Sequence, residues 1–242
     1  STGTRSPAVT PLPRVDLVER FLIVVAGGTG TRMRTSVAKQ FIELEGLPLM
    51  WWTLRRFRAA LGDALDVTLV LYPGLFAAFE ALEAAHGPAG VHRVVPGGEE
   101  RFHSVKAGLA ALPDQGVVAI HDAVRPFPDV ETIRRCFATA AGRTGSAIPV
   151  VPVKDSIREV LGAGSHALNR AGLRAVQTPQ CFDLARIRAA YDVPYDSRFT
   201  DDASVYEYAG EAITLVDGNP ENIKVTTPED LLIARAFLRG EA

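Results

Sequence analysis

The strongest constraint on the fold is an apolar run, FLIVVA, over residues 21–26, which leads directly into Gly27 and Gly28. A continuous apolar run rich in β-branched residues predicts a strand buried on both faces, as in the centre of a parallel sheet. Glycines after such a strand let the backbone approach a ligand closely. We therefore expect the sheet to begin here and the following loop to face a binding site.

The chain then alternates between strand and helix patterns. Apolar runs predict strands at residues 67–71, 91–95, 117–122 and 146–151, and helical spacing predicts helices at residues 49–61, 75–85, 101–112 and 130–141. This order predicts an α/β fold with a doubly wound, mostly parallel, Rossmann-like sheet. Ligands in such sheets bind beyond the carboxyl ends of the strands, so the loops at Gly27, Gly97 and Asp122 are expected to line one site.

Residues 153–177 interrupt this alternation. Two short β-like pieces, IREVL and LRAVQT, flank a glycine-containing stretch and predict a projecting hairpin. An isolated hairpin is marginally stable in water, so we expect this arm to pack on a second subunit of a homodimer. We expect a disordered tail over residues 1–18 and one domain over residues 19–242 that carries the arm.

The C-terminal part returns to regular structure. AITLVDG and ENIKV predict two strands, and a helix follows over residues 228–238. Thr227 has the character of an N-cap, Pro228 suits the first helical position, and Asp230 completes a capping-box pattern.

Charge and composition narrow the partners. The net charge of −2 gives no basic excess for a broad nucleic-acid surface, and no apolar stretch approaches the roughly 20 residues of a membrane span. The two cysteines, Cys136 and Cys181, lack metal-ligand spacing. We expect a cytoplasmic protein without nucleic-acid or membrane partners.

The loop AGGTGTRMRTSVAKQ, over residues 26–40, has the character of a triphosphate cradle. Glycine backbone N–H groups can approach phosphate oxygens, and Arg32 and Lys39 add charge-assisted bonds. The loop lacks the GK[ST] ending of a Walker A motif and does not complete the dinucleotide GxGxxG pattern, which weakens an oxidoreductase alternative. An ordinary strand-to-loop turn is the alternative reading of the glycines alone.

Several further segments accompany this loop in a fixed order: PGGEERFHSV, HDAVRPF, TPQ, TDDAS and NIKVTTPEDL. Together they resemble the 2-C-methyl-D-erythritol 4-phosphate cytidylyltransferase family of the non-mevalonate isoprenoid pathway, over roughly residues 21–238. The resemblance implies transfer of CMP from CTP to 2-C-methyl-D-erythritol 4-phosphate, with release of pyrophosphate. It also implies a Rossmann-like nucleotidyltransferase fold and a homodimer.

The resemblance assigns site residues by position. The catalytic residues implied are Arg32, Lys39 and Lys224. Those implied for CTP are Ala26, Gly27, Gly28, Thr29, Gly30, Gly97, Gly98, Ser104, Asp122 and Ala123. Those implied for the sugar phosphate are Arg125, Ser156, Arg170, Thr178 and Thr200, with Ser156 and Arg170 presented from the partner's arm. Mg²⁺ is the expected ion, held mainly by the CTP phosphates with Asp122 as a protein ligand.

The implied chemistry needs no general base. A phosphate monoester has a second pKa of about 6, so the attacking oxygen is largely ionised at neutral pH. Two alternatives remain open: a cytidylyltransferase for ribitol 5-phosphate or another polyol phosphate, and a regulator that binds nucleotide without turnover.

Overall fold

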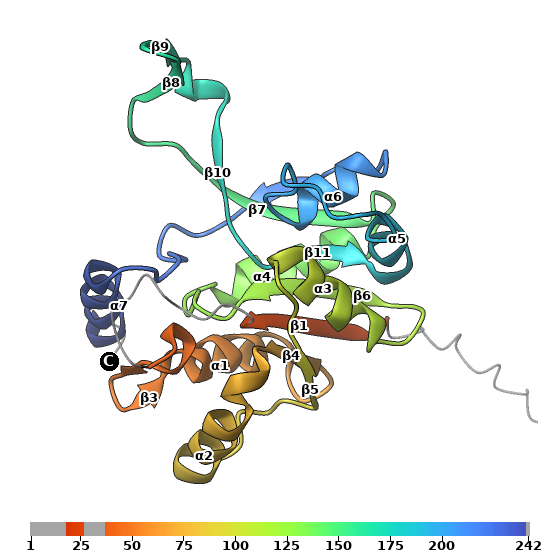
Figure 1. Cartoon of the computed structure of the whole chain (residues 1–242), viewed down its shortest axis with the longest axis vertical. Helices are drawn as coiled ribbons and strands as arrows, with labels where there is room; N and C mark the ends of the chain where they lie inside the picture. Colours follow the sequence, from red (N-terminus) through yellow and green to blue (C-terminus); the bar gives the residue numbers. More distant parts are fainter. Residues whose placement is uncertain (1–17, 27–36, 241–242) are drawn as a thin grey trace, which may run out of the picture.

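The computed structural model describes residues 18–26 and 37–240, so the predictions for the N-terminal tail and for residues 27–36 lie outside the described residues. The described chain forms a central sheet with helices on both faces and an arm that projects from one end (Figure 1). This arrangement confirms the predicted α/β class with a mostly parallel sheet.

Within the described residues, the central sheet has the strand order β10-β7-β11-β6-β1-β4-β5, with β12 paired to β7. The strands are β1 (Arg20–Ala26), β4 (Asp66–Leu71), β5 (Arg93–Pro96), β6 (Val117–Asp122), β7 (Ser146–Pro152), β10 (Arg174–Val176), β11 (Gln180–Asp183) and β12 (Leu215–Asp217). Strand β1 lies in the parallel part, between β4 and β6. Strand β11 is antiparallel to both β6 and β7. The carboxyl ends of β1 and β6 therefore lie side by side, with Val25 opposite Asp122.

The two faces of β1 belong to different cores. Leu22 and Val24 pack with helices α1 (Leu49–Leu61), α2 (Phe76–His86) and α4 (Val130–Ala140). Phe21 and Ile23 pack with helices α3 (Arg101–Ala110), α5 (Leu184–Ala190) and α6 (Asp202–Tyr208). The absence of alternation in FLIVVA follows from this double burial.

The C-terminal helix α7 (Pro228–Gly240) begins where the sequence predicts it. The Thr227 backbone N–H donates to the Asp230 carboxylate at 2.9 Å, and the Asp230 N–H donates to the Thr227 hydroxyl at 3.3 Å. This reciprocal pair is the predicted capping box. Helix α7 packs through Ala234 beside β2 (Glu43–Leu44), which pairs with β3 (Leu47–Pro48).

Three predictions of local structure were wrong. The strand IREVL, which is β8 (Ile157–Leu161), pairs with β9 (Gly164–Leu168), a segment predicted as loop. The predicted partner LRAVQT instead contributes β10, which joins β7 of the central sheet. Gly162 has a φ of +58° and allows the tighter turn between β8 and β9. The segment ENIKV is not a strand, and its Asn222 side chain instead donates to the Thr178 carbonyl at 2.8 Å.

Gly108 sets how closely α3 approaches the sheet. A Cβ at this position would lie 2.9 Å from Ile23 Cγ2 and 3.0 Å from Val70 Cγ2. We expect Gly108→Val to lower the free energy of unfolding by about 1–3 kcal/mol through overpacking, measured by urea denaturation. Ala110→Val, on the exposed side of the same helix, is the control for β-branching. An equal loss in both variants would contradict the packing explanation.

Candidate functional site

A cleft of about 380 Å³ lies at the carboxyl ends of β1 and β6. Its wall is completed by the start of α3 and by the segment before α7. It is lined by Val25, Ala26, Lys39, Gln40, Gly98, Glu99, Glu100, Arg101, Ser104, Asp122, Ala123, Val124 and Lys224. Seven predicted site residues therefore meet here: Ala26, Lys39, Gly98, Ser104, Asp122, Ala123 and Lys224.

Lys39 lies in a 3₁₀ turn, Lys39–Phe41, that follows the predicted phosphate loop. The buried Gln40 side chain donates to the Ala26 carbonyl at 3.2 Å and ties this turn to the end of β1. Arg32, Gly27, Gly28, Thr29 and Gly30 lie outside the described residues. Lys39 is thus held at the cleft by a contact between two sides of the loop.

Gly98 and Ser104 form the part of the cleft at the start of α3. The Gly98 N–H donates to the Ser104 hydroxyl at 3.1 Å. A Cβ at Gly98 would lie 2.4 Å from the His103 Cβ, so this turn requires glycine. Gly97 is not among the cleft-lining residues; its N–H donates to the Leu71 carbonyl at 2.8 Å and anchors the turn to β4.

Asp122 is surrounded by three cations. Its carboxylate oxygens lie 3.4 Å from Arg101 Nε, 3.0 Å from Lys224 Nζ and 3.5 Å from Arg125 Nε. Burial alone would raise the pKa of the Asp122 carboxyl, but these cations outweigh burial and hold that pKa well below its usual range. The site therefore keeps one ionised carboxylate among positive groups.

A second cleft, of about 300 Å³, adjoins the first at this ion cluster. Its lining residues are Arg101, Asp122, Arg125, Val176, Gln177, Thr178, Gln180, Thr200, Asp201 and Lys224. Three predicted sugar-phosphate residues, Arg125, Thr178 and Thr200, meet here. The two clefts share Arg101, Asp122 and Lys224 as a common wall.

His121 lies behind this wall and is fully buried. Its Nδ1 is 2.9 Å from the Thr178 hydroxyl, its Nε2 is 2.9 Å from the Arg125 carbonyl, and its ring meets Phe57 edge to face. Burial lowers the pKa of His121 to about 4. His121 thus supports Thr178 and Arg125 as a neutral structural side chain.

The pKa of His121 gives stability a defined pH dependence. The unfolded state takes up this proton near pH 6.5 and the folded state only near pH 4. The free energy of unfolding should therefore fall as pH drops from about 6.5 to about 4, by up to about 3 kcal/mol. Urea denaturation across this range should give a smaller decrease for His121→Asn. The control His166→Asn, at an exposed position of the arm, should retain the wild-type decrease.

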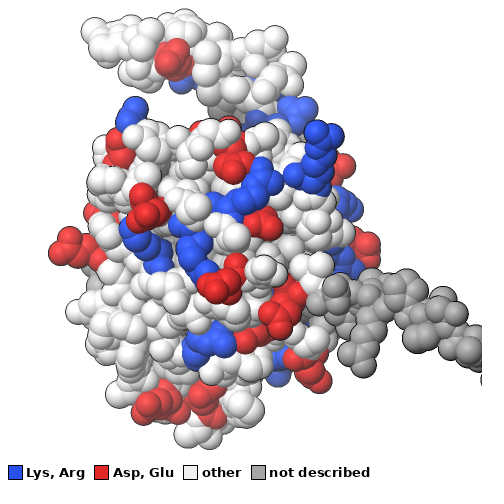
Figure 2. Space-filling view, turned by 90° about the vertical axis from the view of Figure 1, so that its right-hand side faces the viewer, with Lys and Arg blue, Asp and Glu red and all other residues white. Residues whose placement is uncertain are grey.

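Ser156 and Arg170, the other two predicted sugar-phosphate residues, line neither cleft of the single chain. Both are exposed at the arm, where Arg170 Nη1 donates to the Lys154 carbonyl. Figure 2 shows the arm overhanging the body, with mostly uncharged residues on that face. That Ser156 and Arg170 contribute to a site of the partner chain remains a prediction about the dimer.

Sequence reasoning missed Arg101, Asp202 and Gln180. Arg101 lines both clefts and forms a bidentate pair with Asp202. Gln180 donates to the Asp201 carboxylate at 2.9 Å and accepts from the Ala203 N–H at 2.9 Å. All three residues lie in the motifs PGGEERFHSV, TPQ and TDDAS. A polar residue inside a recognised motif is therefore the signal that could have identified them.

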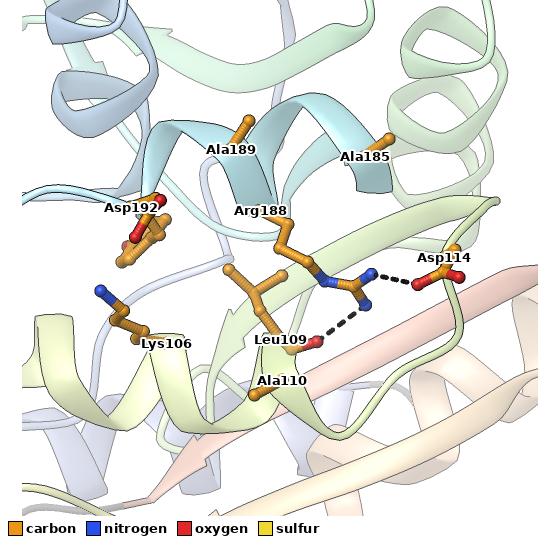
Figure 3. A pocket seen from close by; sticks show the side chains of 9 residues that line it. Lys106, Leu109, Ala110, Asp114, Ala185, Arg188, Ala189 and Asp192 are labelled. Carbon is orange, nitrogen blue, oxygen red and sulfur yellow. Dashed lines mark hydrogen bonds and ion pairs between the residues drawn. The ribbon is translucent and has the colours of Figure 1, made fainter.

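A larger hollow of about 480 Å³ lies between α3 and α5, away from the strand ends (Figure 3). Its most prominent cation, Arg188, donates to the carbonyls of Leu109 and Leu112 at the end of α3 and pairs with Asp114. These contacts give Arg188 a capping role. Arg188 is therefore occupied by contacts with the end of α3, and the hollow is lined by none of the predicted site residues.

Two features are absent from residues 18–26 and 37–240. No helix there is both long and apolar enough to cross a membrane. No group of three or more His, Cys, Asp or Glu side chains there is arranged to hold a metal ion. On the face in Figure 2, basic and acidic side chains are interspersed.

Comparison with known proteins gives a consistent result. The family model described as 2-C-methyl-D-erythritol 4-phosphate cytidylyltransferase matches residues 21–240. Proteins of that name from Bacteroides fragilis and Geobacillus kaustophilus are 43% and 42% identical, over 90% and 89% of this chain and 99% and 95% of theirs.

Solved structures agree in fold. The crystal structure of 2-C-methyl-D-erythritol 4-phosphate cytidylyltransferase from Thermus thermophilus has a TM-score of 0.71 at 31% identity, covering 92% of this chain and 100% of that one. The 4-diphosphocytidyl-2C-methyl-D-erythritol synthase from Anaerococcus prevotii has a TM-score of 0.76 at 26% identity, covering 91% and 98%. The chain belongs to the 2-C-methyl-D-erythritol 4-phosphate cytidylyltransferase family.

Proposed function

We propose that this protein transfers CMP from CTP to 2-C-methyl-D-erythritol 4-phosphate, giving 4-diphosphocytidyl-2-C-methyl-D-erythritol and pyrophosphate. The observation that carries the proposal is the wall shared by two clefts, in which Arg101 and Lys224 face both sides. Two substrates that react through their phosphates need such a meeting point. Family membership supplies the chemistry, and the location at the strand ends supports it.

The reaction joins the acceptor's phosphate oxygen to the α-phosphorus of CTP. The bond from that phosphorus to the pyrophosphate oxygen breaks, and pyrophosphate carries away the electron pair. The attacking oxygen is already ionised at neutral pH, so the site's tasks are positioning and charge stabilisation. Lys39 and Lys224 are the described cations that we assign to charge stabilisation, together with Arg32.

The nucleotide would occupy the first cleft, with its base against Gly98 and Ser104. Gly98 has no side chain where one would clash with His103, and the small residues leave room for a pyrimidine. Ala123 and Ala26 likewise leave space at the strand ends. The acceptor would lie in the second cleft, against Arg125, Thr178 and Thr200.

The residues fit a magnesium ion that arrives with the triphosphate. Asp122 offers one ionised carboxylate at the junction of the clefts, and Mg²⁺ bound to a triphosphate commonly takes one or two carboxylates. When bound, Mg²⁺ would neutralise phosphate charge. The Asp122 carboxylate also lies 3.0 Å from Lys224 Nζ, and this ion pair holds Lys224 in the shared wall.

We also propose a homodimer in the cytoplasm. The arm exposes Val160 and Leu161, which are 73% and 61% exposed, and β10 exposes Val176 next to the second cleft. A second chain would cover these apolar side chains. In this arrangement Ser156 and Arg170 of each arm complete the acceptor site of the other chain.

The decisive experiment measures pyrophosphate release with CTP, Mg²⁺ and a panel of acceptors. The proposal expects rapid release with 2-C-methyl-D-erythritol 4-phosphate and at least roughly tenfold slower release with ribitol 5-phosphate, by analogy with other pocket discriminations. Preference for ribitol 5-phosphate would identify the other polyol-phosphate activity. CTP binding without release for any acceptor would identify a nucleotide-binding regulator.

Arg170 offers a test of the arm. Loss of one charged hydrogen bond to the acceptor should raise the acceptor KM about 10- to 100-fold in Arg170→Ala, with a smaller effect on kcat. Steady-state kinetics at saturating CTP measures both constants. Arg174→Ala, which removes another exposed arginine nearby, is the control.

Mixing variants tests whether the arm acts on the other chain. A mixed dimer of Lys39→Ala and Arg170→Ala chains would hold one fully intact site only if the arm serves its partner. Mixing should then restore turnover at wild-type acceptor KM. No recovery after exchange of subunits, verified by differently tagged chains, would contradict a partner role for the arm.

A further inference from the structure

Asp202 is a fully buried carboxylate that lines neither cleft. It lies at the start of α6, and both of its oxygens accept from Arg101, at 2.8 Å from Nη1 and 2.8 Å from Nη2. The Tyr191 hydroxyl donates to Oδ1 at 2.6 Å. Such a buried carboxylate is costly unless it is paired, and here both oxygens are occupied.

Arg101 extends this arrangement into the site. It is the first residue of α3, and its third nitrogen, Nε, lies 3.4 Å from Asp122 Oδ1. Its side chain is 29% exposed and borders both clefts. A continuous line of polar contacts thus runs from Tyr191 through Asp202 and Arg101 to Asp122.

The geometry fixes the guanidinium plane. A bidentate pair constrains an arginine in both position and orientation, which a single contact does not. Burial alone would lower the pKa of Arg101, but the charges of Asp202 and Asp122 raise it well above its usual range. Without Asp202, Arg101 would retain only the longer contact to Asp122.

We infer that Asp202 is a positioning residue for the transfer reaction: by clamping Arg101 it fixes the wall between the nucleotide and acceptor clefts and orients the Asp122 carboxylate. The inference rests on the proposed function for its catalytic consequence. Asp202 itself touches no substrate, since Arg101 separates it from both clefts. Asp202 is thus a buried residue that supports Arg101, a cation that faces both phosphorylated substrates.

Asp202→Asn tests the inference with little change in shape. Asparagine keeps one accepting oxygen and replaces the other with an NH₂ donor, so the bidentate clamp on Arg101 is lost. We expect kcat to fall about 100-fold, as misplacement of about 1 Å in a site can cause, and the Kd of Mg·CTP, measured by calorimetry, to rise by a smaller factor. Assays should run well below the unfolding temperature of the variant. An unchanged kcat in the folded variant would overturn the inference.

Four companion variants separate positioning from stability. Tyr191→Phe keeps both Arg101 contacts and should leave kcat within about threefold of wild type. Asp66→Asn breaks another bidentate pair, with Arg93 at 2.6 and 2.8 Å at the amino ends of β4 and β5, and should affect stability but not kcat. Arg101→Lys keeps the charge without the fork, so its kcat should resemble that of Arg101→Gln. Recovery of turnover by lysine would overturn the inference.

A readout without turnover distinguishes failure of the inference from failure of the proposed function. The NMR signal of the Arg101 Nε–H group, assigned by its loss in Arg101→Lys, should report a rotationally restricted guanidinium in the wild type. The restriction should persist in Tyr191→Phe and disappear in Asp202→Asn. A restrained Arg101 in Asp202→Asn would overturn the inference. Wild-type protein that shows the restriction but turns over no acceptor would contradict the proposed function alone.

Discussion

Replacing Lys39 with alanine should lower kcat by about 10²–10³-fold at saturating CTP and Mg²⁺, as removal of a preorganised charge-stabilising donor commonly does. The residue lines the nucleotide cleft in a turn tied to β1 by the Gln40 contact to Ala26. Because that contact belongs to Gln40, the turn should keep its position in the variant. Single-turnover measurement of pyrophosphate release separates this loss from slow product release.

The control for Lys39→Ala is another lysine outside the clefts. Lys106 lies on α3 beside the hollow of Figure 3, and Lys106→Ala should leave kcat within about threefold of wild type. Arg32→Ala, in the part of the loop outside the described residues, should lose turnover to the same extent as Lys39→Ala. Near-wild-type kcat for Lys39→Ala with retained thermal stability would refute the assigned role.

Asp122→Asn should also lower kcat by about 10²–10³-fold, since one change removes the proposed metal ligand and the counter-charge of Lys224. The three cations around Asp122 would then repel one another, so Lys224 should leave its position. The Mg²⁺ concentration that gives half-maximal turnover should rise at the same time. A magnesium titration at fixed CTP measures both effects.

Asp114→Asn is the matched control, because Asp114 is an exposed carboxylate that pairs with Arg188 far from the clefts. It should retain wild-type turnover and magnesium dependence. If Asp122→Asn lowered kcat without altering the magnesium titration, Asp122 would act only through its ion pairs. Unchanged values of both would remove Asp122 from the site.

The parts of the fold that the sequence predicts well are those with local patterns. Strands β1 and β6 contain unbroken apolar runs, residues 21–26 and 117–120, because helices cover both faces. Helix α7 begins at a capping box formed by neighbours in the chain. The sequence also singled out Asp122, Ser104 and Lys224, which line one cleft, because each belongs to a motif recognised as a unit. Asp122 ends β6, where the strand-end rule expects a ligand, whereas the segment that carries Lys224 is not a strand.

The remainder depends on contacts that leave no local pattern. Arg101 and Asp202 are 101 residues apart, and nothing near either one predicts the pairing. The strand β11 has only four residues, and its antiparallel placement between β6 and β7 is decided by tertiary packing. The pairing within the arm was misassigned for a related reason. Both β9 and the segment LRAVQT follow β8 as candidate partners, and the turn at Gly162 pairs β8 with β9.

The common wall of the two clefts limits how this protein can change its choice of acceptor. A substitution at Arg101, Asp122 or Lys224 would alter the handling of both substrates at once, so adaptation to a new polyol cannot begin there. Val176 and Thr200 border the second cleft alone. Substitutions that change the choice of acceptor should therefore accumulate at positions that border only the second cleft. The three charged residues of the common wall should stay constant.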